Sequence, residues 1–191
     1  MVLAAVGATP AAAETVTLDP QQTTIQWVLR GFPDTVHGTF RLASGTLAFD
    51  PASGDAGGCL RVDARSGQSG NASRDRKMHE EILESARYPE VALQPTRVEG
   101  ALPANGDAAL KLLGRLALHG AWHLVEMPVR LTRQDARLVA DTVLSVPYVA
   151  WGLTDPSVFI FRAAKTVELD LHAVGAVTTS PTATRIATCG P

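Results

Sequence analysis

Residues 69–89 read SGNASRDRKMHEEILESARYP, and this stretch decides how the rest of the chain is interpreted. Its apolar residues recur at roughly helical spacing: Met78, Ile82, Leu83 and Ala86. Ser73 is a suitable N-cap, and Asp75 falls in the first turn, where the helix dipole favours negative charge. Tyr88 ends the helix, because the residue before a proline avoids helical geometry. A short helix with one apolar face, set among strands, is expected to cover the open end of a β-barrel or sandwich.

Strand patterns occupy the chain on both sides of this helix. Short runs alternate between apolar and polar residues and are separated by turn residues, which predicts strands in these ranges: 24–30, 36–42, 59–66, 90–99, 108–118, 122–133, 136–146 and 166–174, with 16–18 as an extension. The apolar residues change from even-numbered to odd-numbered positions at 43–45, and this shift of parity predicts a bulge or tight bend. About eight to ten antiparallel strands with short turns favour a closed barrel or a sandwich. A barrel of this size is either filled by side chains or encloses one small ligand.

Bulk properties exclude several classes of function. The chain has 191 residues, which suits one domain, and a formal net charge of -2 without a basic stripe, so nucleic acid is not an expected partner. No apolar run reaches the roughly 18 residues of a transmembrane helix. Residues 1–13 are small and uncharged and resemble the end of a signal peptide, with a disordered leader as the alternative. We expect a periplasmic or secreted bacterial protein, a barrel domain over 14–177 and a flexible tail over 178–191.

The two cysteines, Cys59 and Cys189, are far apart in the sequence. In an exported protein they can pair, and an intramolecular disulfide would tie the tail to the barrel wall. Two free thiols or an intermolecular bridge are the alternatives. Two cysteines alone do not make a metal site.

Catalytic and metal-binding patterns are missing from the sequence. His119 and His123 are four residues apart, but Gly120 between them suggests a strand bend and not a zinc-binding helix. No G-x-S-x-G elbow occurs. We therefore expect no metal, no catalytic residues and no enzyme. For Arg74 beside Asp75, a charged latch on a lid competes with a plain helix cap in which Arg74 bonds to a neighbouring loop.

Several motifs, taken in order, resemble the YceI-like family over about residues 15–174. The matching segments are Leu18-Asp19-Pro20, His37-Gly38-Thr39-Phe40, 45–50 (GTLAFD), Arg74-Asp75 opening a helix that ends at Tyr88-Pro89, and 114–120 (GRLALHG). The resemblance implies a lipocalin-like antiparallel β-barrel with a long apolar cavity, capped at one end by the short helix. It also implies binding of a polyisoprenoid or similar amphiphilic lipid, and export in bacteria. The chain departs from the family pattern at 82–86, 122–123 and 147, all near the ends of the barrel.

We therefore expect the protein to bind, and to carry or sequester, a hydrophobic isoprenoid-type lipid that is polyisoprenoid or quinone-like. This lipid is the expected partner, and no other cofactor is expected. The residues expected on the cavity wall are Trp27, Leu29, Phe40, Leu60, Val62, Met78 and Ile82, while Arg74 and His79 would meet a polar head at the mouth. One alternative is an enzyme acting on a hydrophobic substrate through His79 or His119. Another is a filled barrel that serves as an interaction module. A homodimer is left open.

Overall fold

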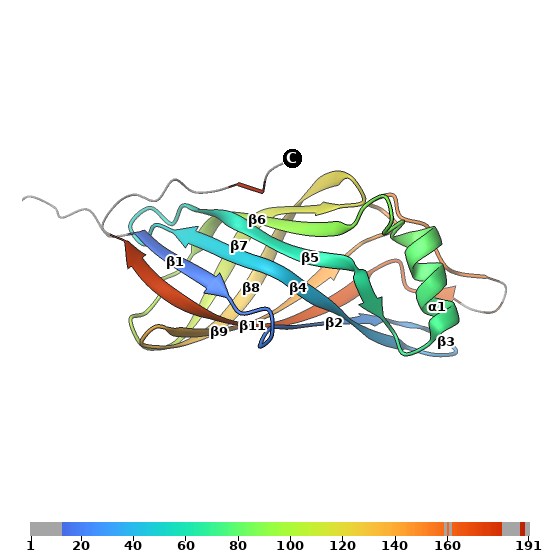
Figure 1. Ribbon diagram of the computed structural model, residues 1–191, viewed down its shortest axis with the longest axis horizontal. Coiled ribbons are helices and arrows are strands. Elements are labelled where there is room, and N and C mark those ends of the chain that lie inside the picture. Colours follow the sequence, from blue (N-terminus) through green and yellow to red (C-terminus); the bar gives the residue numbers. More distant parts are fainter. Residues whose placement is uncertain (1–12, 159, 161, 181–187, 190–191) are drawn as a thin grey trace, which may run out of the picture.

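The computed structural model describes residues 13–158, 160, 162–180 and 188–189. Among them, eight antiparallel strands close into a barrel, and a short helix covers one end (Figure 1). In order around the barrel these are β11 (Val167–Ser180), β2 (Thr24–Leu29), β4 (Val36–Phe49), β5 (Ala56–Gln68), β6 (Glu90–Glu99), β7 (Gly106–Leu118), β8 (Ala121–Gln134) and β9 (Arg137–Val146). Pairing of β9 with β11 closes the ring. The predicted all-β, lipocalin-like barrel of about eight strands is confirmed.

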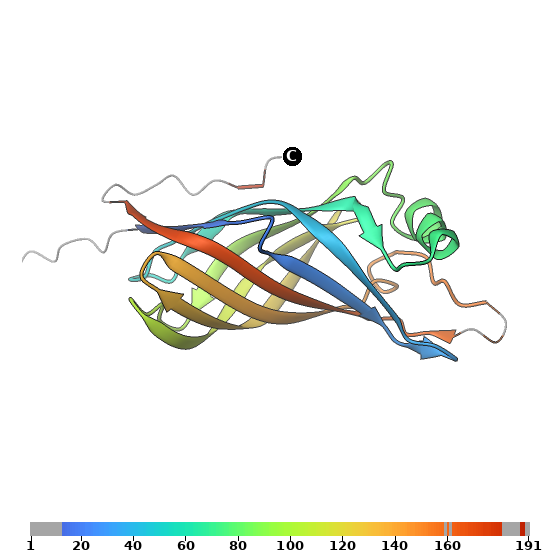
Figure 2. The same cartoon turned by 60° about the horizontal axis from the view of Figure 1, so that its bottom comes forward.

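Strand β1 (Ala13–Leu18) shares one position in the barrel with β2. Each pairs with β11 on one side and with β4 on the other, β1 in the half away from the helix and β2 in the half next to it. Figure 2 shows the two strands following each other between β4 and β11. The turn at 19–23 links them, and Asp19 accepts a hydrogen bond there from the backbone N–H of Gln21.

The ends of the barrel domain differ from the expected boundaries. Strand β11 runs through Ser180, past the expected end at 177, because its last residues pair with β1. Most of the expected tail and residues 1–12 of the expected signal-peptide remnant lie outside the described residues.

The predicted shift of parity in the first half of the chain is a β-bulge inside one continuous strand. Strand β4 slips by one residue against β5 between Leu42 and Ser44. A larger irregularity lies nearer the start of β4, between Thr39 and Arg41. There, residues 64–67 of β5 bulge out of the hydrogen-bonded ladder between the two strands. The bulged residues lie beside the helix that covers the barrel end. They matter for the site because they bring the carbonyl of Gly67 under that helix.

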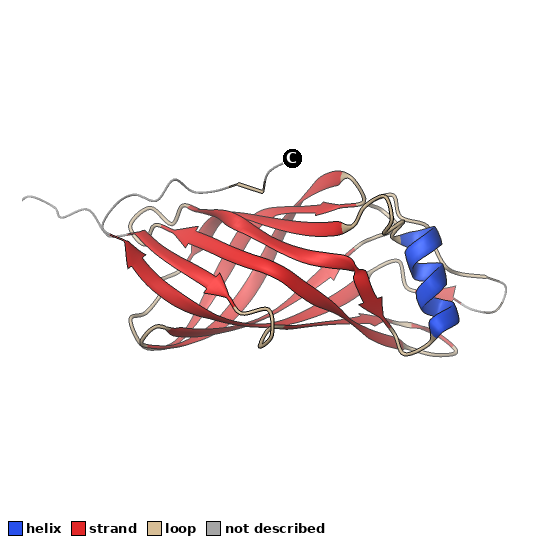
Figure 3. Ribbon diagram, in the orientation of Figure 1, coloured by secondary structure: helices blue, strands red, loops and turns tan. Residues whose placement is uncertain are grey.

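The covering helix consists of α1 (Ala72–Lys77) and a wider π-helical turn, η1 (Met78–Ile82). Figure 3 shows it as the one helical segment drawn for the described residues. The N-cap is Asn71 and not Ser73: Asn71 is extended, and its side-chain oxygen accepts a hydrogen bond from the backbone N–H of Arg74 at 3.0 Å. Asp75 lies in the first turn, as predicted. The helix ends before Glu84, whose φ of 44° is left-handed, and so earlier than the expected end at Tyr88.

The two halves of the barrel interior differ. In the half away from the helix, these apolar side chains from β1, β8, β9 and β11 are buried: Val16, Leu18, Leu131, Leu138 and Val177. At the end of the barrel that the helix covers, β3 (Gly31–Phe32) and β10 (Arg162–Ala163) pair into a small separate sheet. Residues 147–157 run beside this sheet. Side chains therefore fill one half, while the half under the helix holds the site described next.

Candidate functional site

A cavity of about 600 Å³ lies inside the half of the barrel next to the helix. Each strand of the barrel contributes wall residues to it. The strand residues on the wall are Ile25, Trp27, Leu29, Val36, Phe40, Leu42, Leu60, Val62, Val91, Leu93, Leu116, Leu118, Met127, Thr142, Leu144, Val146, Val167, Leu169 and Leu171. All but Thr142 are apolar, and the volume is within the usual range of small-molecule pockets.

Strand register places the wall residues in layers below the helix. Along β11, Val167 is next to the helix end, Leu169 lies one layer deeper, and Leu171 another layer deeper. Leu169 pairs with Trp27 of β2, and Leu171 pairs with Thr142 of β9. Four residues of extended chain span about 13 Å. The cavity is thus a tunnel long enough for an extended chain, and its lower end meets the filled half of the barrel.

Polar side chains of the wall gather at the helix, which forms the mouth: Asn71, Ser73, Arg74 and Lys77. The Arg74 guanidinium donates hydrogen bonds to Ser69, from Nε to Oγ at 2.7 Å and from Nη2 to the backbone carbonyl at 3.2 Å. Arg74 is therefore bonded to the neighbouring loop, and it also lines the cavity. Lys77 pairs with Glu81 at 3.9 Å. The mouth carries positive charge above an apolar tunnel.

Asp75 fixes this mouth to the end of β5. Its carboxylate accepts hydrogen bonds from the Ser69 backbone N–H, at 2.8 Å, and from the Ser69 hydroxyl. Since Arg74 also bonds to Ser69, the Arg-Asp pair holds the loop before the helix from both sides. Two alternatives were considered for this pair: a charged latch, and a plain helix cap in which Arg74 bonds to a neighbouring loop. Both describe the same set of contacts.

Eight of the nine residues expected at the ligand are on the cavity wall: Trp27, Leu29, Phe40, Leu60, Val62, Arg74, Met78 and Ile82. The structure places His79 elsewhere. Its Nε2 is 2.8 Å from the carbonyl oxygen of Gly67, and its Nδ1 is 3.0 Å from the hydroxyl of Ser85. The imidazole therefore ties the helix to β5 instead of facing a ligand at the mouth.

His119, the other histidine considered for catalysis, is also engaged away from the cavity. Its Nε2 lies 2.9 Å from Oε1 of Glu84, and its ring packs 4.4 Å from the ring of Tyr88. Neither histidine is among the residues that line the cavity. Within the described residues, no group of three or more His, Cys, Asp or Glu side chains could hold a metal ion.

The sequence analysis missed the wall residues of β6, β7, β8, β9 and β11 and the loop that crosses beside the mouth. Alternation in 142–146 and 167–171 is visible in the sequence and could have identified the strand residues. The loop residues on the wall have no such pattern: Tyr148, Leu153, Pro156 and Val158. They reach the cavity because the chain turns at 147–153 and runs across the barrel end.

Contacts of this crossing loop hold it in place. The Tyr148 hydroxyl donates a hydrogen bond to the carbonyl of Ala164 at 2.8 Å. Burial, with a smaller contribution from the charge of Asp155, raises the pKa of Tyr148 to about 12, so the phenol stays neutral. Asp155 pairs with Lys165, and this hydrogen bond, followed by one from Ser157, lowers the pKa of the Asp155 carboxyl to about 2.

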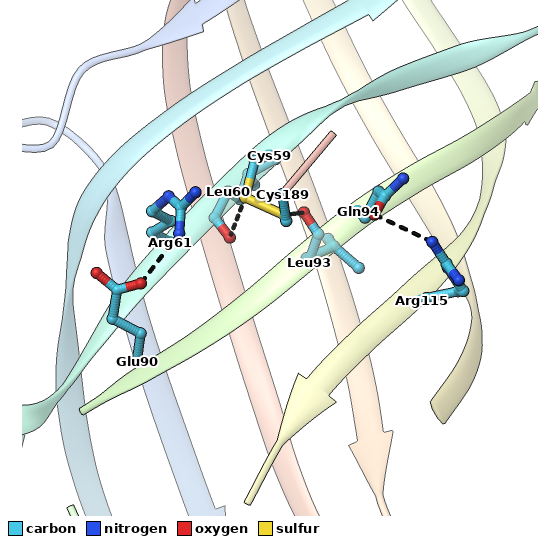
Figure 4. The surroundings of a disulfide bond; sticks show 8 residues. All are labelled: Cys59, Leu60, Arg61, Glu90, Leu93, Gln94, Arg115 and Cys189. Carbon is cyan, nitrogen blue, oxygen red and sulfur yellow. Dashed lines mark hydrogen bonds and ion pairs between the residues drawn. A yellow bond between two sulfur atoms is a disulfide. The ribbon is translucent and has the colours of Figure 1, made fainter. Parts of the chain in front are cut away.

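A disulfide joins Cys59 to Cys189 across the wall of the barrel. Figure 4 shows it between β5 and β6, with the Arg61–Glu90 ion pair on one side. Thr188 pairs with β5 in a short parallel bridge beside it. The bond therefore holds the end of the chain against the barrel wall, which is the intramolecular alternative considered above.

Comparisons with known proteins agree with this architecture. BcnA of Burkholderia cenocepacia superposes with a TM-score of 0.69 at 18% identity, covering 82% of this chain and 98% of that one. A polyisoprenoid-binding domain from Saccharophagus degradans, implicated in plant cell wall breakdown, gives a TM-score of 0.64 at 15% identity, covering 85% and 98%. No curated protein matches the chain. None of the helices described is long and apolar enough to cross a membrane. The family model for the YceI-like domain matches residues 16–175, and the chain therefore belongs to the YceI-like family.

Proposed function

We propose that the protein binds, and carries or sequesters, a hydrophobic isoprenoid-type lipid, polyisoprenoid or quinone-like, inside the barrel. The observation that carries this proposal is the distribution of polarity in the cavity. Apart from Thr142 of β9, the strand residues of its wall are apolar, and its charged groups, Arg74 and Lys77, lie at the mouth. Such a tunnel accepts a long apolar chain and leaves a polar head beside the cations.

The volume and the apolar wall together set the scale of the binding energy. At roughly 30 Å³ for each water-sized group, 600 Å³ holds about 20 non-hydrogen atoms, or about four isoprene units. Each buried CH₂ contributes about 0.8 kcal/mol before the costs of association, so about 20 carbons supply roughly 16 kcal/mol gross. Association and ordering of the chain offset a large share of this gain. Burial of the apolar chain, and not polar contacts, is therefore the main source of the proposed affinity.

The comparisons support the class of ligand. The domain from Saccharophagus degradans is described as polyisoprenoid-binding, and it shares the barrel fold with this chain over 98% of its own length. Membership of the YceI-like family further supports a binding protein over an enzyme, and a location in the bacterial periplasm or outside the cell. An amphiphilic lipid is the proposed partner.

Extraction of the purified protein tests this proposal. The protein is isolated without detergent from its native host, extracted with organic solvent, and the extract is analysed by mass spectrometry. We expect a prenyl-type lipid in near-stoichiometric amount. Protein that carries no lipid, or a random mixture of membrane lipids, would count against the proposal.

A matched pair of variants separates the cavity from the rest of the barrel. Leu144→Glu places a carboxylate on the cavity wall, whereas Val143→Glu places the same group on the outer face of the same strand, where Val143 is 55% exposed. Burying an unpaired charge is costly, so Leu144→Glu should abolish the bound lipid. Val143→Glu should retain it. Equal lipid content in both variants would place the lipid outside the cavity.

A further inference from the structure

Large apolar side chains are exposed at the end of the barrel that the helix covers. Among the described residues, three such side chains belong to this end, and together they are called the apolar tip: Phe32 (68% exposed), Val158 (51%) and Ile160 (79%). The other exposed large apolar residues of the described chain lie on β8 and β9, on the outer wall: Trp122, Leu124 and Val143. Single apolar residues on a surface are normal, whereas a group of them at one place marks an interaction site.

Strand register keeps the members of the apolar tip close together. Phe32 of β3 is the register partner of Arg162 of β10. Ile160 is two residues before Arg162, and two residues span at most about 7 Å. With about 5 Å between paired residues, the Cα atoms of Ile160 and Phe32 are no more than about 12 Å apart. Figure 2 shows the helix (green) on one side of this barrel end, and β3 (blue) and β10 (orange) on the other.

The apolar tip is continuous with the mouth of the cavity. Val158 is half-exposed and also lines the cavity, so it belongs to both. Leu153 and Pro156 of the crossing loop line the cavity on the same side. On the side of the helix, Arg74 and Lys77 line it. The mouth therefore has an apolar lip, formed by the crossing loop, and a cationic lip, formed by α1.

Positive charge is concentrated on the part of the helix that forms the cationic lip. Three of the four charged residues of α1 are cations: Arg74, Arg76 and Lys77. The fourth, Asp75, already accepts hydrogen bonds from Ser69. Arg76 is exposed. The carboxylates Glu80 and Glu81 follow on η1, so the excess of cations is confined to α1.

We propose that this end of the barrel docks on a lipid bilayer, with the apolar tip inserted among the lipids and the cations of α1 against anionic headgroups. A bilayer offers an apolar layer and a charged layer side by side. Its acyl region accepts the apolar lip, and its anionic headgroups attract the cationic lip. A second protein would have to provide both features in the same arrangement.

The inference rests on the proposed function, because it concerns how a lipid ligand reaches the cavity. A long apolar chain is poorly soluble in water, so a carrier has to load it from a membrane and release it to one. With the mouth against the bilayer, the chain passes between the lipids and the tunnel without crossing water. Docking itself needs no ligand in the cavity and is measured separately.

Flotation with vesicles of phosphatidylglycerol and phosphatidylethanolamine tests the docking. We expect Phe32→Ser and Ile160→Ser each to lower the partition coefficient about tenfold, since each removes a large apolar side chain from the contact. Leu124→Ser is the matched control: Leu124 is 85% exposed, but it lies on the outer wall, so partitioning should be unchanged. Arg76→Gln should weaken binding to these anionic vesicles and leave binding to phosphatidylcholine vesicles unchanged.

Tryptophan fluorescence provides a second readout that removes no contact. The indole introduced by Phe32→Trp should be quenched by vesicles with brominated acyl chains, whereas the indole introduced by Leu124→Trp should not. Equal quenching of the two, or equal loss of partitioning in the serine variants at 32, 160 and 124, would overturn the inference. So would an absence of binding to either kind of vesicle, which would leave the tip to a protein partner.

The failures of the two proposals are distinguishable. Protein that carries an extractable lipid but ignores vesicles overturns the docking alone. Protein that docks through the apolar tip but carries no lipid from its native host supports the docking and overturns the proposed function.

Discussion

Replacing Cys189 by serine removes the disulfide that holds the end of the chain to β5. Cys59 and Cys189 are separated by 130 residues, so the bond closes a loop that contains most of the barrel. In the chain-entropy relation, closing a loop of about 130 residues restricts the unfolded state by an amount worth about 5 kcal/mol at 25 °C. We expect Cys189→Ser to lower the free energy of unfolding by up to this amount. With a urea m-value of about 2 kcal/mol per M, the midpoint falls by up to about 2.5 M.

Urea denaturation followed by far-UV circular dichroism measures this shift. Cys59→Ser and the parent protein treated with a reductant serve as controls, because all three lack the same bond and should show the same midpoint. Lipid content should be unchanged, since neither cysteine lines the cavity. A midpoint shift of less than about 0.5 M, equivalent to roughly 1 kcal/mol, would refute the loop-closure reasoning. Two titratable thiols in the untreated protein would refute the bond itself.

Three further perturbations address the mouth and the wall. Gly38→Val should lower the free energy of unfolding by about 1–3 kcal/mol in urea titrations and reduce lipid content, because its Cβ would overlap the Trp27 indole packed there; an unchanged midpoint would contradict this. The pKa of Asp155 is lowered to about 2, chiefly by Lys165, so their contact stabilises the fold above the ordinary pKa of 3.8 and is lost as the pH falls through 2. The stability difference between parent and Asp155→Asn should thus be present at pH 6 and vanish near pH 2, and a constant difference would argue against the assignment. Asp75→Ala should cost about 1–2 kcal/mol by releasing Ser69 and should accelerate amide exchange over 69–83, whereas unaltered exchange would rule out the latch.

Much of the wall could be predicted because a half-buried strand has a strict period of two. Alternation in 24–30 placed Trp27 on an inward face, and the shift of parity at 43–45 located the bulge in β4. The same pattern runs through 142–146 and 167–171. There, Thr142 interrupts the apolar face, although it too lines the cavity.

Features that depend on contacts between distant segments could not be predicted in the same way. Asn71 and Ser73 are equally good caps by residue type, and the choice between them depends on where the chain leaves β5 and becomes helical. The helical pattern showed His79 beside an apolar face, but the bulge in β5 brings the Gly67 carbonyl to its ring. Likewise, pairing of the cysteines depends on the end of the chain returning to β5.

A crystal structure of the protein purified from its native host tests the central claim most directly. The account predicts continuous, elongated density that runs from the mouth at Arg74 past Trp27 to the layer of Thr142, in a volume of about 600 Å³. Separate water peaks along the tunnel, or wall side chains turned inward to fill it, would contradict the account.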